Sequence, residues 1–429
     1  MNIKKANQKL QKWIEARAKS DNLDLNDLTS AAGLALPYIF NGNLSLNGLT
    51  SAEGLTLPER VNYLSLNGLT SAAGLKLPER VGSLSLDGLT TTAGLMLPES
   101  IEENLSLNGL TSAVGLKLPK RAGTSGGYVF GSYQWRKLAN LSLNGLTSAA
   151  GLTLPEGFDV IRLNGLTSAA GLMLPERGVG LALNPDDALQ AVAERGGVGI
   201  LLLNGLKSAA GLVLPERVER LSLDGLKSAA GLVLPKRVES LSLNGLTSAA
   251  GLVLPKRVES LSLNGLTSAA DLKLPDSIED GLSLNGLVSA VGLILPKRVG
   301  TSLHLDGLTS TAGLTLPESL DGELSLGGLT SGAGLTLPES FNGELSLVGL
   351  TSGAGLTLPE SFNGDLRLDL TSAVGLRLPK RLSVLYLSSL TRAEGLTLPE
   401  SFDDVWIDAL PDTEKEKLRQ RHPEHANKI

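Results

Sequence analysis

Apolar and polar positions recur along this chain with a period of 20 or 21 residues. One unit, residues 61–80, reads VNYLSLNGLTSAAGLKLPER. Within it, Leu64-Ser65-Leu66 alternates apolar and polar side chains, which predicts a short strand with one buried face. The next two residues, Asn-Gly, are typical of turns because both tolerate positive φ. Each unit is therefore expected to form one strand and one turn of a repeat structure.

The remaining apolar positions of the unit are expected to fill the space inside the turn. They are Leu69, Ala72, Leu75 and Leu77. Pro78 has no N–H to donate, which suits a corner of the chain where no ladder bond is needed. One unit alone has no two-sided core, so its leucines must be buried against the units before and after it. The pattern predicts an elongated solenoid with a parallel sheet, its strands about 4.8 Å apart.

The leucine-proline step of the repeat is interrupted twice. The first interruption, of 36 residues after Pro119, corresponds to one repeat plus an aromatic insertion at 121–140. The second, of 40 residues after Pro175, is interpreted as two repeats with a degenerate unit at 181–199. In that unit Asn184 is a good helix cap and is followed by proline, which predicts a helical turn.

The apolar spacing LxxLxL is found in unit after unit. Two examples are Val61, Leu64 and Leu66, and Val218, Leu221 and Leu223. This pattern resembles the leucine-rich repeat, in a short form of bacterial type, over residues 23–410. The resemblance implies an α/β-type repeat solenoid, that is, a leucine-rich arc with one short parallel strand per turn and helical caps.

The chain departs from the family at the position of the usual asparagine. Leucine stands three residues after the strand, as at Leu69, and the asparagine comes two residues earlier, at Asn67. The hydrogen-bond ladder between turns is therefore expected to involve Thr70 and Ser71 instead. A parallel β-helix stays open as an alternative, because the alternating segment 75–77 is compatible with a second short strand.

Both ends of the solenoid are expected to carry helical caps that cover its last apolar faces. Residues 1–22 form the N-terminal cap, with a helix that places Leu10, Trp13 and Ile14 on one side. Residues 411–429 form the C-terminal cap and tail, with prolines that begin and end a helix.

Composition excludes several classes of function. The absence of cysteine excludes disulfides, thiolate zinc sites and cysteine nucleophiles. A net charge of −6 disfavours nucleic acid as a partner. The chain has no run of eighteen apolar residues, so membrane insertion is not expected. The N-terminus lacks the apolar core of a signal peptide. A cytoplasmic location is the default, and export without a cleaved signal stays open.

Catalysis and cofactor binding are not expected from the residues present. Serines such as Ser65 recur at the strand centre, but a serine nucleophile needs a general base within hydrogen-bond reach. Of the three histidines, His304, His422 and His425, two lie in the tail. Those two have nearly the spacing of metal ligands, but they lack a third ligand, and a disordered tail explains them better. The chain is predicted to be no enzyme and to hold no metal or cofactor.

Candidate binding residues lie in the insertion and along the strand centres. The insertion combines rigid aromatic rings with a neighbouring arginine, the residue types that anchor interfaces. These residues are Tyr128, Phe130, Tyr133, Trp135 and Arg136. A hairpin whose rings simply pack back on the solenoid is the alternative. The row of strand-centre serines is broken at Arg162, Leu202, His304, Arg367 and Tyr386.

The sequence favours a non-catalytic protein-binding scaffold that uses the concave solenoid face and the aromatic insertion, as a monomer. The region from Glu318 to Asp365 holds seven acids and no base, a charge gradient able to steer a partner. One alternative is an adhesive solenoid that binds a glycan or another lattice through its uniform Ser/Asn face. Another, by resemblance, is the recognition domain of a secreted bacterial effector without enzymatic activity.

Overall fold

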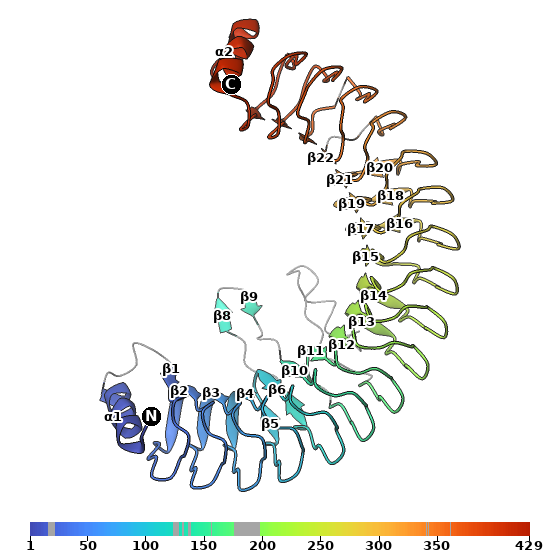
Figure 1. Ribbon diagram of the computed structural model, residues 1–429. Coiled ribbons are helices and arrows are strands. Elements are labelled where there is room, and N and C mark those ends of the chain that lie inside the picture. The colour runs from blue at the N-terminus through green and yellow to red at the C-terminus, as the bar shows by residue number, and fades with distance from the viewer. Residues whose placement is uncertain are drawn as a thin grey trace. The chain divides into compact units, whose positions relative to one another are not determined.

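The structure is a computed structural model that describes residues 1–15, 22–122, 128–130, 133–135, 139–155, 157–175, 198–339, 341, 343–360 and 362–429. The chain divides into two units. Unit 1 comprises Met1–Gly225 with Gly231–Arg237, and unit 2 comprises Leu226–Ala230 with Val238–Ile429. Each unit is a parallel β-solenoid in which the strands of successive turns lie side by side and the loops lie on the opposite side of the turn (Figure 1).

The core of each turn consists of the leucines that the repeat pattern predicted to be inside. In the turn 61–80, Leu64, Leu66, Leu69 and Ala72 are fully buried, and Leu75 is nearly so. Two short backbone bonds close the corners: the Leu69 N–H donates to the Leu66 carbonyl at 3.1 Å, and the Leu75 N–H donates to the Ala72 carbonyl at 3.0 Å. Apolar burial inside and between turns is the main stabilising term of such a stack.

In unit 1 each turn adds a strand parallel to the one before it. These strands are β1 (Asn22–Asp24), β2 (Ile39–Ser45), β3 (Arg60–Ser65), β4 (Arg80–Ser85), β6 (Asn104–Ser106), β10 (Asn140–Ser142), β11 (Val160–Arg162), β12 (Val198–Leu202) and β13 (Arg217–Ser222). The register places Leu44, Leu64 and Leu84 in one row. The leucines of successive turns therefore stack directly on one another.

Unit 2 repeats this arrangement. Its main strands are β14 (Arg237–Ser242, in this unit from Val238), β15 (Ser260–Ser262), β17 (Gly281–Ser283), β19 (Ser302–His304), β21 (Glu323–Ser325), β22 (Leu345–Leu347), β23 (Leu366–Leu368), β24 (Val384–Tyr386) and β25 (Asp404–Trp406). Residue Leu324 pairs with Leu345, and Leu345 pairs with Leu366. The buried leucine row thus continues through the unit.

The predicted solenoid is confirmed, and it is almost entirely β-structure. The second strand considered at 75–77 is not formed there. In several turns a second strand, two residues long, lies after the proline of the repeat instead. These strands are β5 (Ser100–Ile101) with β7 (Arg121–Ala122), and β16 (Ser277–Ile278), β18 (Arg298–Val299) and β20 (Ser319–Leu320). None of the helices in the described ranges is long and apolar enough to cross a membrane.

The two interruptions leave the register of the sheet intact. Strand β10 pairs directly with β6, and Leu141 lies opposite Leu105. Strand β12 pairs directly with β11, and Leu201 lies opposite Ile161. Of the degenerate unit predicted at 181–199, only Val198 and Gly199, which begin β12, belong to the described residues, so its interpretation as a turn of the stack stays a prediction. The predicted helix in that segment lies outside the described residues.

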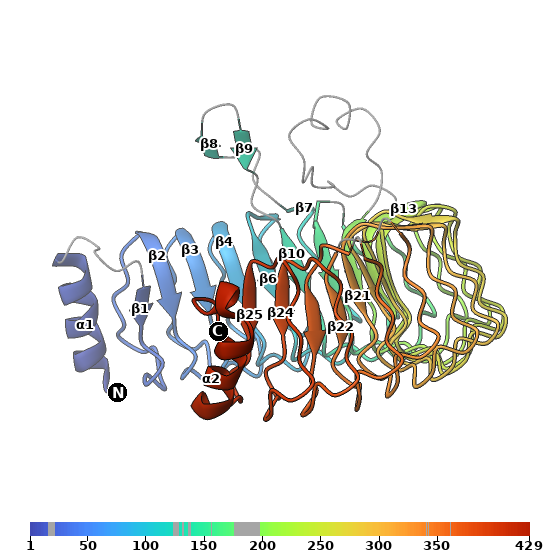
Figure 2. The same ribbon diagram turned by 90° about the horizontal axis from the view of Figure 1, so that it is seen from above.

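Helix α1 (Ile3–Glu15) covers the first turns of unit 1, as both views show (Figures 1 and 2). Leu10 is buried, and the Trp13 ring stacks on Phe40 with centroids 4.3 Å apart. Ile14, which the pattern placed on the same side, is 40% exposed. The Asn7 side chain donates to the Gly33 carbonyl at 2.9 Å and accepts from the Ala35 N–H at 3.2 Å. It thereby satisfies backbone groups that the open end of the first turn would expose.

Helix α2 (Asp412–Arg421) and the short helix η2 (Pro423–His425) cover the loop side of the last turn. Arg421 donates to the Ala393 carbonyl at 2.6 Å and to the Leu396 carbonyl at 3.2 Å. His425 is buried, and its Nε2 lies 3.1 Å from the Pro399 carbonyl oxygen. The interpretation of the tail histidines as part of a disordered terminus was wrong, because the ring of His425 packs into the cap at 4.6 Å from Phe402.

Candidate binding surface on the strands

The outward side chains of the main strands form a surface that we call the strand face. Alternate residues of a strand point to opposite sides. In each strand of the form x-Leu-z, the leucine is buried and x and z point outward. In strands β19 and β21 to β25 of unit 2, the first column x is Ser302, Glu323, Glu344, Asp365, Val384 and Asp404. The second column z is His304, Ser325, Ser346, Arg367, Tyr386 and Trp406.

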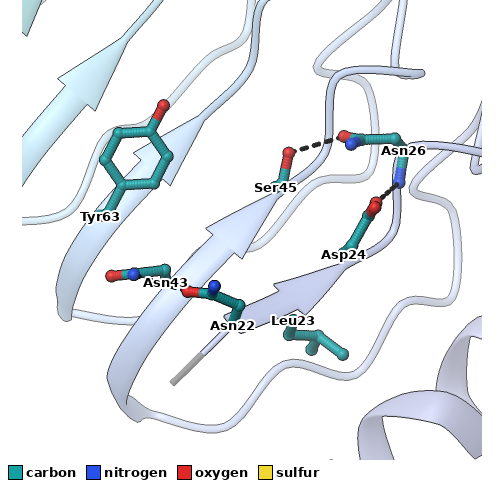
Figure 3. Close-up of a pocket in the computed structure, with 7 residues that line it drawn as sticks. All are labelled: Asn22, Leu23, Asp24, Asn26, Asn43, Ser45 and Tyr63. Atoms are coloured by element: carbon teal, nitrogen blue, oxygen red, sulfur yellow. Dashed lines mark hydrogen bonds between the residues drawn. The ribbon is translucent and has the colours of Figure 1, made fainter. Parts of the chain in front are cut away.

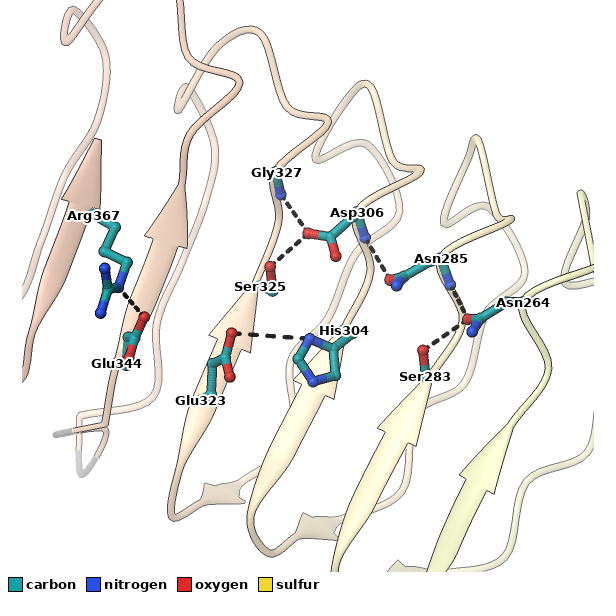
Figure 4. A network of polar contacts seen from close by, with 10 residues as sticks. All are labelled: Asn264, Ser283, Asn285, His304, Asp306, Glu323, Ser325, Gly327, Glu344 and Arg367. Carbon is teal, nitrogen blue, oxygen red and sulfur yellow. Dashed lines mark hydrogen bonds and ion pairs between the residues drawn. The ribbon is translucent and has the colours of Figure 1, made fainter. Parts of the chain in front are cut away.

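A ladder of polar side chains runs along one edge of the strand face (Figure 4). The Asn264 Oδ1 accepts from the Ser283 hydroxyl at 2.7 Å and from the Asn285 N–H at 2.8 Å, both in the next turn. Asp306 accepts in the same way from the Ser325 hydroxyl at 2.6 Å and from the Gly327 N–H at 2.8 Å. Each ladder residue therefore ties its own turn to the following one.

The ladder predicted at Thr70 and Ser71 is made by asparagine instead. The Asn67 Oδ1 accepts from the Ser85 hydroxyl and the Asp87 N–H, each at 2.8 Å. Ser71 accepts from an N–H of its own turn. Thr70 receives only long bonds of 3.5 Å from the next turn. Asn67 comes two residues after the end of β3, and its side-chain oxygen reaches both the Ser85 hydroxyl and the Asp87 backbone N–H in the next turn.

The uniform serines of the second column have a structural role. The hydroxyls of Ser262, Ser283 and Ser325 each donate to the ladder residue of the preceding turn. Ser325 and Ser346 are also mostly buried. Where the preceding turn has an asparagine or aspartate at the ladder position, a serine here thus holds the two turns together, and a turn that replaces the serine places a different side chain on the surface.

Three successive replacements lie together at the end of unit 2. The Arg367 guanidinium carbon lies 3.8 Å from the centroid of the Tyr386 ring. The Tyr386 and Trp406 rings are nearly parallel, at 13°, with centroids 6.3 Å apart. Glu344 accepts a hydrogen bond from Nε of Arg367 (Figure 4). These residues form a continuous stack of one cation and two rings, which we call the C-terminal stack.

The charge of Arg367 is stabilised where it lies. Partial burial disfavours the guanidinium, but the hydrogen bond and negative charge of Glu344 outweigh it and raise the pKa of Arg367 above its usual value. The arginine is thus a fixed cation over the Tyr386 ring, an arrangement favoured by the ring quadrupole.

The other predicted strand-centre residues lie apart from the C-terminal stack. His304 is separated from Arg367 by β21 and β22, and its Nδ1 lies 4.0 Å from Glu323. Arg162 belongs to unit 1 and donates to Asn140 at 3.3 Å. Leu202 is a half-buried residue of the same unit. In the part of the chain that the structure describes, no three His, Asp or Glu side chains are arranged to hold a metal ion.

The sequence interpretation missed Trp406. It follows Tyr386 by 20 residues, one repeat, and pairs with it in the sheet. That spacing was a sufficient signal: Trp406 lies within the predicted solenoid, residues 23–410, but was not counted among the breaks in the serine column. Structurally it belongs to the last strand and is 46% exposed.

The aromatic insertion contains a pair of antiparallel strands. Strand β8 (Tyr128–Phe130) pairs with β9 (Tyr133–Trp135), and Phe130 lies opposite Tyr133 in the backbone register. Arg136 and the side chains of Tyr128, Phe130, Tyr133 and Trp135 lie outside what the structure describes. Their predicted role in binding stays a prediction.

A shallow depression of about 420 Å³ lies on the strand face of unit 1 (Figure 3). Its walls carry amides, a hydroxyl, a carboxylate and one aromatic ring. The residues are Asn22, Leu23, Asp24, Asn26, Asn43, Ser45 and Tyr63. The Asn43 amide donates to Asn22 at 2.7 Å, and the Ser45 hydroxyl donates to Asn26 at 2.7 Å. The depression is rich in neutral hydrogen-bonding groups beside an exposed ring.

Comparison with known proteins gives no family for this chain: a scan against protein-family models and a search of curated proteins found no match. The side chains of the strand face are therefore the basis for a functional proposal.

Proposed function

We propose that this chain is a non-catalytic scaffold that binds a protein partner through the strand face of unit 2. The C-terminal stack is the observation that carries this proposal. Tryptophan, tyrosine and arginine are the residue types most enriched among the anchors of protein interfaces. Here all three occur in successive turns, at a position where most other turns have serine. The replacements expose rings and a cation on an otherwise small and polar surface.

We further infer that the turns are of the leucine-rich-repeat type. The LxxLxL spacing, the single main strand per turn and an asparagine that accepts from the next turn support this inference. The small amount of helix fits a short repeat, since 20 residues leave little chain to return from one strand to the next. Fold alone does not fix a function, so the proposed partner depends on the surface residues.

Returning the C-terminal stack to the repeat pattern is expected to abolish partner binding. The variant Arg367→Ser/Tyr386→Ser/Trp406→Ser places at each position the serine that earlier turns carry at 325 and 346, and it removes the cation and both rings without adding bulk. Loss of anchors worth about 2 kcal/mol or more predicts an affinity at least thirtyfold weaker. The measurement is the Kd for a protein captured by cross-linking to the wild-type chain and then purified.

The matched control is Arg162→Ser, which makes the same kind of replacement on the strand face of unit 1. It is expected to leave the Kd within twofold. A triple variant that binds the purified partner as tightly as the wild type would show that the C-terminal stack is not the binding surface.

A glycan is the second candidate ligand, favoured by the depression in unit 1. Amides and a carboxylate can exchange hydrogen bonds with sugar hydroxyls, and the Tyr63 ring offers an apolar face. Tyr63 stands where other turns have asparagine or serine, as at Asn43 and Ser83. We expect Tyr63→Ser to remove at least nine tenths of any glycan-array signal. A signal retained by this variant would exclude the depression as the site.

A further inference from the structure

We propose that the end of the C-terminal stack binds the guanidinium group of an arginine-containing peptide, with Trp406 as the ring beneath it and Asp404 as its counter-ion. This inference rests on the proposed function and names the chemistry of the partner. It follows from the way in which the chain holds its own arginine on the same surface.

The first step is that the stack has an uncovered end. One face of the Trp406 ring is turned toward Tyr386, to which it is nearly parallel. Among the described residues, no strand pairs with β25 on the side away from β24, and the helices α2 and η2 follow it. The hydrogen bonds of these helices go to Ala393, Leu396 and Pro399, in the loop of the preceding turn. Trp406 therefore remains 46% exposed, and the next layer of the stack is open to a ligand.

The second step is the carboxylate that accompanies this ring. Arg367 lies in the second column, and its counter-ion Glu344 lies in the first column one strand earlier. A cation placed one strand spacing, about 4.8 Å, beyond Trp406 has Asp404 in that same relative position. The Asp404 side chain is exposed, and one of its oxygens accepts from the Val405 N–H at 2.8 Å. Within the described residues no donor faces its other oxygen, which is available to a ligand.

The third step is the choice of cation. Guanidinium is planar and weakly hydrated, so it stacks on an indole ring while it donates to a carboxylate, whereas an ammonium group offers only a point charge. The chain itself stacks an arginine on a ring of this surface, with the Arg367 guanidinium carbon 3.8 Å from the centroid of the Tyr386 ring. The first column is also acidic farther along unit 2, with Glu323, Glu344 and Asp365 in the turns of β21 to β23, whereas the adjacent strand β24 carries the uncharged Val384. A partner segment rich in arginine therefore matches both the ring and the charge.

The test uses the full-length protein and a fluorescein-labelled peptide of four arginines separated by glycines, with binding followed by fluorescence anisotropy. The variants are Trp406→Ser, which restores the repeat residue, and Asp404→Asn, which keeps the acceptor for the Val405 N–H but removes the charge. The control is Asp403→Asn, which removes an exposed neighbouring charge outside both columns. Peptides with lysine or glutamate in place of arginine complete the set.

We expect Trp406→Ser and Asp404→Asn each to weaken arginine-peptide binding at least tenfold, and Asp403→Asn less than twofold. The lysine peptide should bind more weakly than the arginine peptide, and the glutamate peptide should not bind. Equal effects of Asp404→Asn and Asp403→Asn, or no effect of Trp406→Ser, would overturn the inference. So would the absence of any binding by the arginine peptide. Those outcomes leave the proposed function standing if the triple serine variant still loses its purified protein partner.

Discussion

Replacement of Gly265 by alanine is expected to unfold the first turns of unit 2 at a far lower denaturant concentration than in the wild type. A Cβ at this position would lie 2.2 Å from the Asn244 carbonyl oxygen and 2.5 Å from that of Leu246. Both oxygens belong to the backbone of the preceding turn, so neither can rotate away as a side chain would. The two turns must separate instead, which exposes the leucines stacked between them. We expect a loss of about 3 kcal/mol, at the upper end of overpacking effects.

The control is Gly251→Ala, in the turn before. Gly251 has φ of +75°, but a Cβ there would meet no heavy atom within 4 Å. Its cost is the left-handed backbone alone, about 1–2 kcal/mol. The next turn already has a non-glycine residue at the equivalent position, Asp271, with φ of +62°. Urea midpoints by circular dichroism, with hydrogen exchange of β14 and β15, compare the two variants. Equal losses would mean that close approach of the backbones does not limit the spacing of the turns.

This contrast shows which part of the fold the sequence predicts. The repeat identifies the buried leucines, because a position that faces the core in every turn carries an apolar residue in every unit of the sequence. Leu64, Leu66 and Leu69 were placed inside by pattern alone, and all are fully buried. Gly265 and Gly251 look alike in sequence, although the first is required because the backbone of the preceding turn leaves no room for a Cβ, and the second because its φ is positive. The two requirements are distinguished only by the positions of the neighbouring turns in the structure.

The candidate binding surface was less predictable for a related reason. Breaks in the serine column identified Arg367 and Tyr386, and the structure brings these two together. The pattern does not distinguish them from His304, which has a serine on each neighbouring strand, or from Arg162, whose neighbour across the sheet is Leu202. Contact depends on replacement in successive turns, a property of neighbours and not of single positions. The direct pairing of β11 with β12 was missed because a 40-residue step equals two repeats in number.

Replacement of Asn264 by alanine is expected to give the second large loss of stability. The substitution removes the oxygen that accepts from the Ser283 hydroxyl and the Asn285 N–H, and the amide that donates to the Ser262 hydroxyl at 3.1 Å. The half-buried N–H and hydroxyl of the next turn are left without their acceptor. An unsatisfied buried group costs about 1–3 kcal/mol, so the variant should lose at least about 2 kcal/mol. Equilibrium unfolding in urea gives the value, with exchange at the Asn285 amide as the local measurement.

The variant Asn264→Asp tests the contribution of the acceptor oxygen apart from that of the amide NH2 group. The aspartate keeps the oxygen that the next turn needs, as Asp306 does for Ser325 and Gly327 in the same unit. It loses only the donor to Ser262, so we expect a cost of about 1 kcal/mol or less. If alanine and aspartate prove equally damaging, the ladder is not held by its acceptor oxygen. If the loss of stability in Asn264→Asp is small, the connection between turns depends on one acceptor oxygen, which explains why the chain has aspartate at some ladder positions. The backbone N–H of the next turn then keeps its acceptor even where the serine is replaced, so a turn is able to present a ring or a cation at that position.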